Sequence, residues 1–552
     1  MSRSNPIQIV DLFAGPGGLG EGFSSYDNGD AFEIIVSAEM EPSAHSTLRL
    51  RAFYRYLKKF NPGAMDDYYS FCHTAGMSAP YTERSKGAWL HAEREAQQIE
   101  LGTDVGNKKL DEILEDRLDE TKPWVLIGGP PCQAYSLAGR SRNKGNINYR
   151  AEGDHRHFLY REYLRIIQRK KPTIFVMENV KGILSSKVGG ELMFPKILED
   201  LAAPDVALGE TDSGQRYRIC SLVSDDMYVD GASFAKFNPS NFIIRSELFG
   251  VPQARHRVIL LGISEDLFNA KAGGLARLRP RPSVSVGEAI GGLPPLRSKV
   301  TGRKDNFVGW VETVTRSIKH LNKELKTRIE NEGVEPEAVK LSVEFDVKAR
   351  CFSGTVEGRE LDSGGLRVLK SEKWLGETKT HLDNWFQDKN LNYWLNHEAR
   401  GHMESDLQRY VYAAEFSRIY QRSPKGHNDF NLPGLAPNHK NWESGNFGDR
   451  FRVQLKNYPS TTITSHIAKD GHYFIHYDSS QCRSLTVREA ARLQTFPDNY
   501  FFLGNRTQQF HQVGNAVPPF LAQQIASIVA ELMGGSESYD VRSPIAQMDM
   551  SY

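Results

Sequence analysis

The stretch Asp11-Leu-Phe-Ala-Gly-Pro-Gly-Gly-Leu-Gly20 decides how the first part of this chain folds. It continues the apolar run Gln8–Phe13, and Gly15, Gly17 and Gly20 have the spacing GxGxxG. Glycines at this spacing permit a tight turn after a strand and let a ligand approach the backbone closely. The spacing alone suits a dinucleotide, another adenosine cofactor or merely a tight turn. It therefore predicts a strand, a turn and a helix, but no particular ligand.

The rest of the first half alternates strand-like and helical patterns. Four further apolar runs are typical of buried strands: Glu33–Ala38, Val125–Ile127, Thr173–Met177 and His256–Ile263. One helical repeat lies among them, with apolar residues at Leu159, Tyr163, Ile166 and Ile167. This alternation predicts an α/β fold with a parallel sheet covered by helices on both faces. Ligands bind beyond the carboxyl ends of such strands, so the residues that follow each strand matter most.

The alternating pattern covers only part of the chain. We expect residues 1–263 to form the first domain, with a helical insertion at 51–98. The irregular, charged stretch 264–480 predicts a second, smaller α+β domain. Regular signals then return over 481–535, and we expect the Ser-rich residues 536–552 to form a flexible tail.

Two helices mark the return to the first domain. Thr486 and Glu489 have the spacing of a capping box at a helix start. Pro518 and Pro519 precede the helical pattern Phe520–Met533, and proline favours the first turn of a helix.

Composition excludes several classes of protein. The 552 residues carry 69 Lys and Arg against 68 Asp and Glu, and 39% are hydrophobic, which argues against a disordered chain. The net charge of +1 gives no bulk signal for nucleic-acid binding. No signal peptide and no apolar run of about 20 residues is evident, so we expect no membrane contact and a location in the cytoplasm.

The five cysteines are scattered and form no CxxC pair, which predicts neither disulfides nor a zinc ribbon. Cys132 differs from the others because it lies in Gly128-Gly-Pro-Pro-Cys-Gln-Ala-Tyr-Ser136, directly after an apolar run. A thiol on such a loop is exposed, and nearby positive charge would make it reactive. We expect the other four cysteines to be buried structural residues.

Polar residues also follow three other strands. Glu39 ends the second strand, about twenty residues after the glycine turn, where a carboxylate can bind ribose hydroxyls. Glu178 follows the fourth strand and can donate a proton. Arg255 and Arg257 alternate at the start of the fifth, which puts them on one face, where they suit anions or a base edge. Taken singly, each of these residues is equally compatible with a structural role.

Six segments together resemble the bacterial cytosine-5 DNA methyltransferases. They occur in the order DLFAGPGG, PPCQ, ENV, QARHR, REAARLQTFPD and GNAVPP. The resemblance covers about residues 7–262 and 460–533. It implies a doubly wound, Rossmann-like sheet that uses S-adenosylmethionine, with a target-recognition domain at 264–480.

The resemblance also implies roles for individual residues. Cys132 would be the nucleophile and Glu178 the acid, with Arg255 and Arg257 in the base pocket and Gln133 and Ser136 on the catalytic loop. The cofactor residues would be Phe13, Ala14, Gly15, Gly17, Gly18, Glu39, Met40, Asp104, Pro131, Asn515 and Val517. Asp104, the acid expected beside the adenine, follows the insertion at an unusual spacing. Thr462 and Thr464 lie close to the return and are candidates for target recognition, and no metal is expected.

The implied activity is methylation of a flipped-out cytosine in double-stranded DNA by a monomer. A restriction endonuclease is the expected functional partner, because such methylases protect DNA from a cognate nuclease. Three alternatives remain: a tRNA cytosine-5 methyltransferase, a catalytically idle DNA-binding regulator on the same fold, and a NAD-dependent dehydrogenase. Only the GxGxxG spacing and Glu39 suggest the dehydrogenase.

Overall fold

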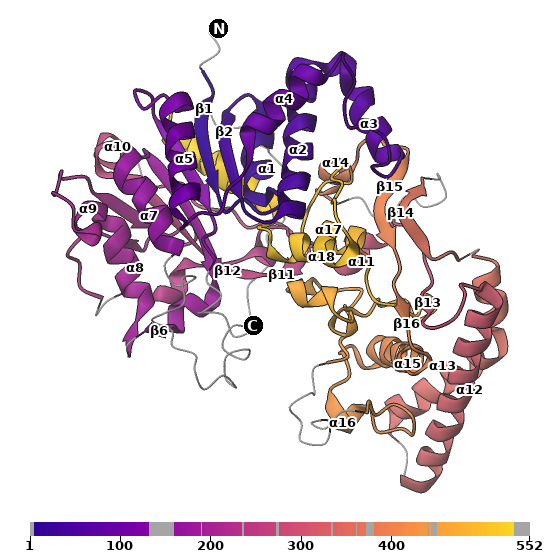
Figure 1. Cartoon of the computed structure of the whole chain (residues 1–552). Helices are drawn as coiled ribbons and strands as arrows, with labels where there is room; N and C mark the ends of the chain where they lie inside the picture. The colour runs from indigo at the N-terminus through magenta and orange to yellow at the C-terminus, as the bar shows by residue number, and fades with distance from the viewer. Residues whose placement is uncertain are drawn as a thin grey trace.

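The computed structural model describes residues 5–131, 159–188, 190–234, 237–271, 275–332, 335–359, 361–370, 380–438, 442 and 450–534. Within them, nine strands form one sheet in the larger of two lobes (Figure 1). These strands are β1 (Ile7–Leu12), β2 (Phe32–Glu39), β3 (Ala96–Gln98), β4 (Trp124–Gly128), β5 (Ile174–Val180), β8 (Tyr217–Cys220), β9 (Met227–Tyr228), β10 (Ile243–Arg245) and β12 (His256–Ser264). The predicted tail at 536–552 lies outside the described residues.

The sheet is mixed. Its order is β3-β2-β1-β4-β5-β12-β8-β9, with β10 also paired to β12. Strands β1 to β5 pair in parallel, but β12 runs antiparallel to β5, β8 and β10. All five strands expected from the sequence are present. The first four pair in parallel as expected, whereas the fifth, β12, is antiparallel. The doubly wound, Rossmann-like α/β class is confirmed, because the parallel strands spread to both sides of β1.

Helices cover both faces of the sheet. One face packs against α1 (Gly18–Ser25) and α19 (Pro519–Leu532), and the other against α5 (Asp104–Arg117), α7 (Leu159–Lys170) and α8 (Met193–Ala202). Side chains alternate across a strand, so Ile9 joins the cluster of α19 while its neighbour Val10 joins that of α5. Helix α19, near the end of the described chain, therefore covers one face of the sheet to which the first strand, β1, belongs.

The predicted insertion is largely helical. Residues 51–98 contain the later part of α2 (Pro42–Phe60), which begins before residue 51. They also contain α3 (Met65–His73), α4 (Lys86–Glu95) and the edge strand β3. The hydrophobic core of the insertion contains Phe53 and Tyr68 together with Leu395 and Phe501 from the C-terminal half of the chain. The insertion therefore packs against both lobes (Figure 1).

The second lobe combines helices with short strands. Its core lies between α12 (Phe307–Glu332), α13 (Pro336–Glu357) and α15 (Glu404–Tyr420). Beside them, β14 (Gly364–Leu369) and β15 (Tyr393–Glu398) form an antiparallel pair. No helix of the described residues is both long and apolar enough to span a membrane.

Residues on both sides of the expected second domain still pack or pair with the larger lobe. After residue 263, α10 (Glu265–Ala270) still packs on the sheet through Leu267 and Phe268. Before residue 481, β17 (Ser460–Thr461) already pairs with β11 (Gln253–Ala254). Residues just after 263 and just before 481 therefore still contact the larger lobe.

The return segment contains α17 (Val487–Leu493) and α18 (Arg506–Asn515). The capping box predicted at Thr486 and Glu489 is present in full. The remaining helices and strands are short: β6 (Lys187–Val188), β7 (Glu191–Leu192), α9 (Pro204–Leu208), α11 (Val286–Ile290), β13 (Lys299–Val300), α14 (Asp383–Phe386), β16 (Gly401–His402) and α16 (Gly426–Asp429).

Three of the four cysteines expected to be structural are buried: Cys72, Cys220 and Cys482. The expectation is wrong for Cys351, which is exposed. It lies on α13, where its hydrogen bond to the Val347 carbonyl occupies the solvent-facing side of the helix.

Candidate functional site

An acid and an arginine meet at the edge where β4 and β5 end. Because β12 is antiparallel to β5, its first residues lie beside the carboxyl end of β5. Ile259 is directly opposite Glu178, so Arg257, two residues earlier, is on the same face as that glutamate. Arg257 Nε lies 2.9 Å from Glu178 Oε1, and the two side chains are 15% and 12% exposed. Two residues about 80 positions apart thus form one half-buried ion pair.

The loop after β4 packs against this pair. A Cβ on Gly129 would lie 2.9 Å from Glu178 Oε2, so a larger residue there would require the carboxylate or the loop to shift. The Asn179 side chain donates a 3.4 Å hydrogen bond to the Pro130 carbonyl, which holds the loop beside β5. Pro131, half-buried, is the last described residue of this loop. Cys132, Gln133 and Ser136 lie outside the described residues.

Arg255 has different surroundings from Arg257. It is 2% exposed, and its Nη1 donates to the carbonyls of Ile463 and Gly514 at 3.0 and 3.1 Å. Burial, with the charge of Arg257 nearby, holds the pKa of Arg255 well below its usual range. This side chain joins the residue before β12 to the segments around Ile463 and Gly514, so of the two arginines only Arg257 meets the acid.

The glycine turn after β1 is held by close backbone packing. A Cβ on Gly18 would lie 2.3 Å from the Val517 carbonyl oxygen, so α1 touches the return segment backbone to backbone. Phe13, half-buried just before the turn, adopts a φ of 57°, in the left-handed region. Asn515 ends α18 with its side chain exposed beside this contact.

Glu39 joins the turn to the end of β2. Its carboxylate accepts hydrogen bonds from the backbone N–H groups of Gly15 and Glu41, at 2.8 and 2.7 Å. Burial raises the pKa of Glu39 above its usual value, and these two hydrogen bonds oppose that effect. The carboxylate therefore holds the glycine turn beside the carboxyl end of β2.

The surroundings of the turn suit an adenosine cofactor. Gly15 has φ of +58°, and no atom lies within 4 Å of the position of a Cβ there. The space in front of the turn is therefore open, as close approach of a ligand to the backbone requires. Met40, directly after Glu39, is 55% exposed and presents an apolar side chain at the same edge. A half-buried carboxylate, an open glycine turn and an exposed apolar residue fit an adenosine with its ribose.

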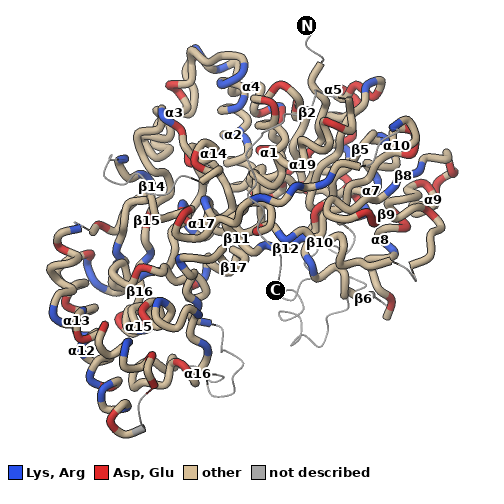
Figure 2. Tube along the Cα trace, turned by 180° about the vertical axis from the view of Figure 1, so that it is seen from behind, with Lys and Arg blue, Asp and Glu red and all other residues tan. Residues whose placement is uncertain are grey.

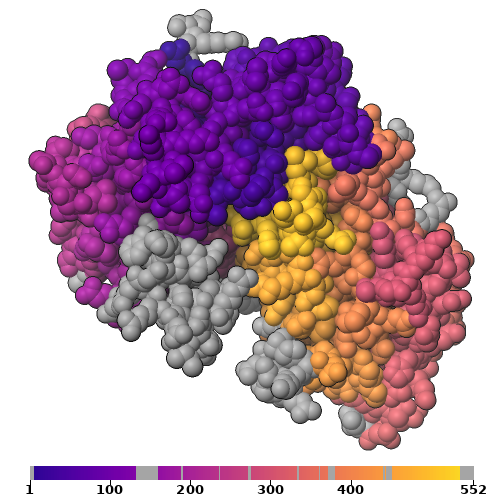
Figure 3. Space-filling model, viewed as in Figure 1, coloured from indigo at the N-terminus to yellow at the C-terminus, as the bar shows by residue number. Residues whose placement is uncertain are grey.

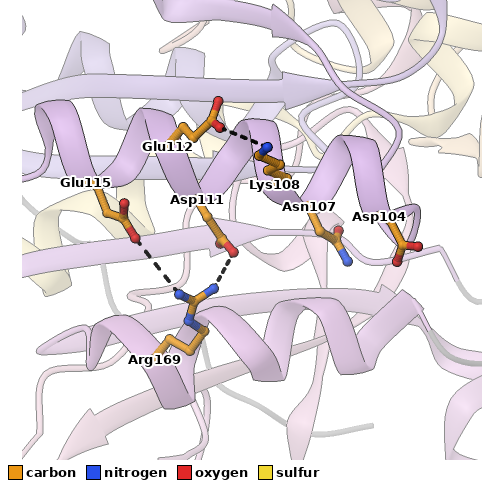
Figure 4. Close-up of a pocket in the computed structure, with 7 residues that line it drawn as sticks. All are labelled: Asp104, Asn107, Lys108, Asp111, Glu112, Glu115 and Arg169. Atoms are coloured by element: carbon orange, nitrogen blue, oxygen red, sulfur yellow. Dashed lines mark hydrogen bonds and ion pairs between the residues drawn. The ribbon is translucent and has the colours of Figure 1, made fainter.

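Asp104, the acid expected beside the adenine, lies at the start of α5 and not directly at the end of β3. It begins α5 and lines an open surface pocket between α5 and α7 (Figure 4). In that pocket Arg169 pairs with Asp111 and Glu115, and none of the marked interactions involves Asp104 (Figure 4).

Glu100 is a position that the sequence reasoning missed. Gln98 pairs with Glu39, and the Ile99 N–H donates to the Glu39 carbonyl at 3.1 Å. The exposed Glu100 therefore follows directly at the carboxyl end of β3. The signal for it, a three-residue strand after a helical insertion, is too short to recognise from periodicity.

The recognition candidates lie between the lobes. Thr462 is half-buried and donates to the Ala254 carbonyl at 2.7 Å, while Thr464 precedes a short helical turn. Arg245 ends β10 and Arg257 is the second residue of β12, and Figure 2 shows basic residues around these strands. The surface is hollowed between the lobes (Figure 3). Trp310 and Arg297 of the second lobe are buried, and Arg297 pairs with Asp305, so these two side chains belong to the core and do not face the hollow.

Comparison with known proteins identifies the family. The model of the C-5 cytosine-specific DNA methylases matches residues 97–205 and 233–531. The type II methyltransferase M.Bpa9945I of Bacillus paralicheniformis is 31% identical over 96% of this chain and 99% of its own length. M.AgeI of Thalassovita gelatinovora is 24% identical over 95% and 99%, and M.ApeKI of Aeropyrum pernix, a DNA (cytosine-5-)-methyltransferase, is 27% identical over 74% and 81%. The chain therefore belongs to the C-5 cytosine-specific DNA methylases.

Proposed function

We propose that this enzyme methylates carbon 5 of a cytosine flipped out of duplex DNA, through a covalent bond to Cys132. The observation that supports this most is the half-buried pair of Glu178 and Arg257, next to the loop that leads to Cys132. A carboxyl group and a guanidinium side by side match the N3 and carbonyl oxygen of a cytosine edge.

The chemistry follows from the weakness of carbon 5 as a nucleophile. The Cys132 thiolate attacks carbon 6, while Glu178 gives a hydrogen bond or a proton to N3 and Arg257 holds the carbonyl oxygen. The ring then has the character of an enamine, with electron density on carbon 5. S-adenosylmethionine, when bound, supplies the electrophilic methyl group to that carbon. Loss of the carbon 5 proton re-forms the double bond to carbon 6 and expels the Cys132 sulfur.

The cofactor would lie across the glycine turn. Phe13, Ala14 and the Gly15–Gly18 turn would face it, with Glu39 on the ribose hydroxyls and Met40 beside the adenine. Pro131, Asn515 and Val517 would close the pocket from the neighbouring loops. The open space at Gly15 and the half-buried carboxylate of Glu39 support this arrangement.

Arg255 would act behind the base pocket. Its two carbonyl partners belong to the segments around Ile463 and Gly514, and it precedes Arg257 by two residues. We therefore assign it to positioning Arg257, while Gln133 and Ser136 would close on the flipped base from the Cys132 loop.

The biological role is protection of DNA from a cognate restriction endonuclease. The names of the relatives, type II methyltransferases, support this role and a duplex DNA substrate. The hollow between the lobes (Figure 3) is the expected place for the duplex, and Thr462 and Thr464 remain the candidates for target recognition. Such an enzyme would act in the cytoplasm, and we propose that it works as a monomer.

Incubation with tritiated S-adenosylmethionine and mixed-sequence duplex DNA tests the proposal. We expect label on carbon 5 of cytosine, identified by digestion to nucleosides. Cys132→Ala should abolish labelling and still bind the cofactor, whereas Cys351→Ala, which changes an exposed cysteine on α13, should behave as the wild type. Labelling by Cys132→Ala would remove Cys132 as the nucleophile.

The same assay separates the alternatives. Total absence of labelling with intact DNA binding would favour an idle regulator. Labelling of tRNA in preference to duplex DNA, measured in a mixture of both, would favour the RNA enzyme.

A further inference from the structure

A tyrosine from the return segment reaches into the cofactor turn. Tyr500 is 1% exposed, and its hydroxyl donates a hydrogen bond to the Pro16 carbonyl. A Cβ on Gly17 would lie 3.0 Å from the same hydroxyl. The middle of the glycine turn therefore packs directly against a side chain that lies more than 480 positions later in the chain.

Arg51 of α2 holds this tyrosine in place. Its guanidinium lies 4.8 Å from the centroid of the Tyr500 ring, and its Nη1 donates to Asn499 Oδ1 at 2.8 Å. Two further hydrogen bonds, at 2.8 and 2.6 Å, join it to the buried carboxylate of Glu21 in α1. Arg51 thus connects the helix that follows the turn to the segment that carries Tyr500.

The carbonyl of Pro16 depends on this contact. Proline has no N–H, so the carbonyl is the only backbone hydrogen-bonding group of this residue in the turn. Loss of one neutral hydrogen bond costs about 0.5–1.5 kcal/mol, and a buried carbonyl left without a partner costs more. A turn without this bond would spend part of its time in shapes that do not fit a ligand.

We propose that Tyr500 is a positioning residue for the cofactor: its hydroxyl fixes the glycine turn in the binding shape, and Arg51 holds the ring. This assignment rests on the proposed use of S-adenosylmethionine. It implies that the return segment contributes to cofactor affinity through Tyr500, independently of Asn515 and Val517.

Tyr500→Phe isolates the hydroxyl. The ring packs edge-on against Phe496 at 4.8 Å and contacts Phe502 at 5.3 Å, and phenylalanine preserves both contacts. Tyr217→Phe is a matched control. Tyr217 is also 1% exposed and donates to a proline carbonyl, that of Pro172 at 2.8 Å, but on β8, away from the turn.

Calorimetric titration of the full chain with S-adenosylhomocysteine is the measurement. We expect the Kd of Tyr500→Phe to rise about 3- to 10-fold, which is the loss of one hydrogen bond expressed as affinity. In the labelling assay its KM for S-adenosylmethionine should rise similarly, with kcat at saturation within about twofold of the wild type, because Glu178 and Arg257 are untouched. Tyr217→Phe should show wild-type Kd and KM.

Each result bears on the assignment. Wild-type affinity in Tyr500→Phe would overturn it, and so would an equal loss in Tyr217→Phe, since both would then reflect general stability. A wild-type chain that does not bind S-adenosylhomocysteine would refute the proposed function itself and this inference with it. Weaker binding by Tyr500→Phe alone would support both.

Discussion

At the scale of single residues, the site depends on which partner each charged group has. Glu178 pairs with Arg257 through Oε1, and there is no room for a Cβ on Gly129 beside its Oε2 without a shift. Arg255 is two residues from Arg257, yet its Nη1 faces backbone carbonyls of other segments. Two arginines that look equivalent in the sequence therefore perform different tasks.

The acid beside the adenine can be tested at the same scale. We expect Glu100→Gln to weaken binding of S-adenosylhomocysteine about 3- to 10-fold, because Glu100 follows β3 directly beside Glu39. Asp104→Asn should change the Kd by less than twofold, since Asp104 lines the open surface pocket between α5 and α7. Calorimetric titration of both variants with S-adenosylhomocysteine decides which acid lies beside the adenine. A larger loss of affinity in Asp104→Asn than in Glu100→Gln would return that role to Asp104.

At the scale of elements, the direction of β12 creates the site. A parallel strand would carry its first residues to the far end of the sheet, away from the carboxyl ends of β4 and β5. The antiparallel pairing with β5 instead puts Arg257 opposite Val180 and within reach of Glu178. The loop after β4 meets the same edge because β4 pairs in parallel with β5.

Gly129→Ala tests how closely that loop must approach β5. A Cβ there would lie 2.9 Å from Glu178 Oε2, so the carboxylate or the loop must shift. We expect kcat to fall at least tenfold in the labelling assay, because misplaced catalytic groups lose much of their effect. Gly87→Ala on α4, where no atom lies within 4 Å of an added Cβ, should retain full activity. Full activity in Gly129→Ala would show that the close contact does not matter for catalysis.

At the scale of the whole molecule, buried polar side chains join the lobes. Gln253 donates to the Leu493 carbonyl at 3.2 Å and accepts from the Ile463 N–H at 2.7 Å. His397 of the second lobe lies between the Pro294 carbonyl and the Thr486 hydroxyl, each at 2.9 Å. A carbonyl oxygen only accepts, so Nε2 carries the hydrogen toward Pro294. A neutral imidazole with this tautomer accepts from the Thr486 hydroxyl at Nδ1, and therefore fits both partners.

Stability should therefore fall as the pH drops below neutral. Burial lowers the pKa of His397 from 6.5 to about 4, and that of His476 likewise to about 4. Because the folded pKa lies below the unfolded one, this stability is present above pH 6.5 and is lost as the pH falls toward 4. Each histidine should cost about 2 kcal/mol of unfolding free energy between pH 7 and pH 5.

Urea unfolding at pH 7 and pH 5 measures this loss. His397→Gln should lose less stability than the wild type between the two values, because glutamine does not titrate. His511→Gln, which changes an exposed histidine on α18, should lose as much as the wild type. An unchanged pH dependence in His397→Gln would contradict the assignment.

The sequence by itself determined the local structure. The GxGxxG turn, the five apolar strands, the α7 repeat and the capping box at Thr486 depend on neighbours a few residues apart, and all are present. The order of the six motifs also predicted the family, which the comparisons bear out. Short β3 could not be predicted, because three residues carry no measurable period.

Only the tertiary structure decided which distant residues meet. The direction of β12, the pairing of Arg257 with Glu178, the carbonyl partners of Arg255 and the contact of Tyr500 with Pro16 join residues between about 80 and more than 480 positions apart. Such contacts are fixed by how the sheet, the insertion and the return pack together. Periodicity reports which face of an element is buried, and it carries no information on what lies opposite that face.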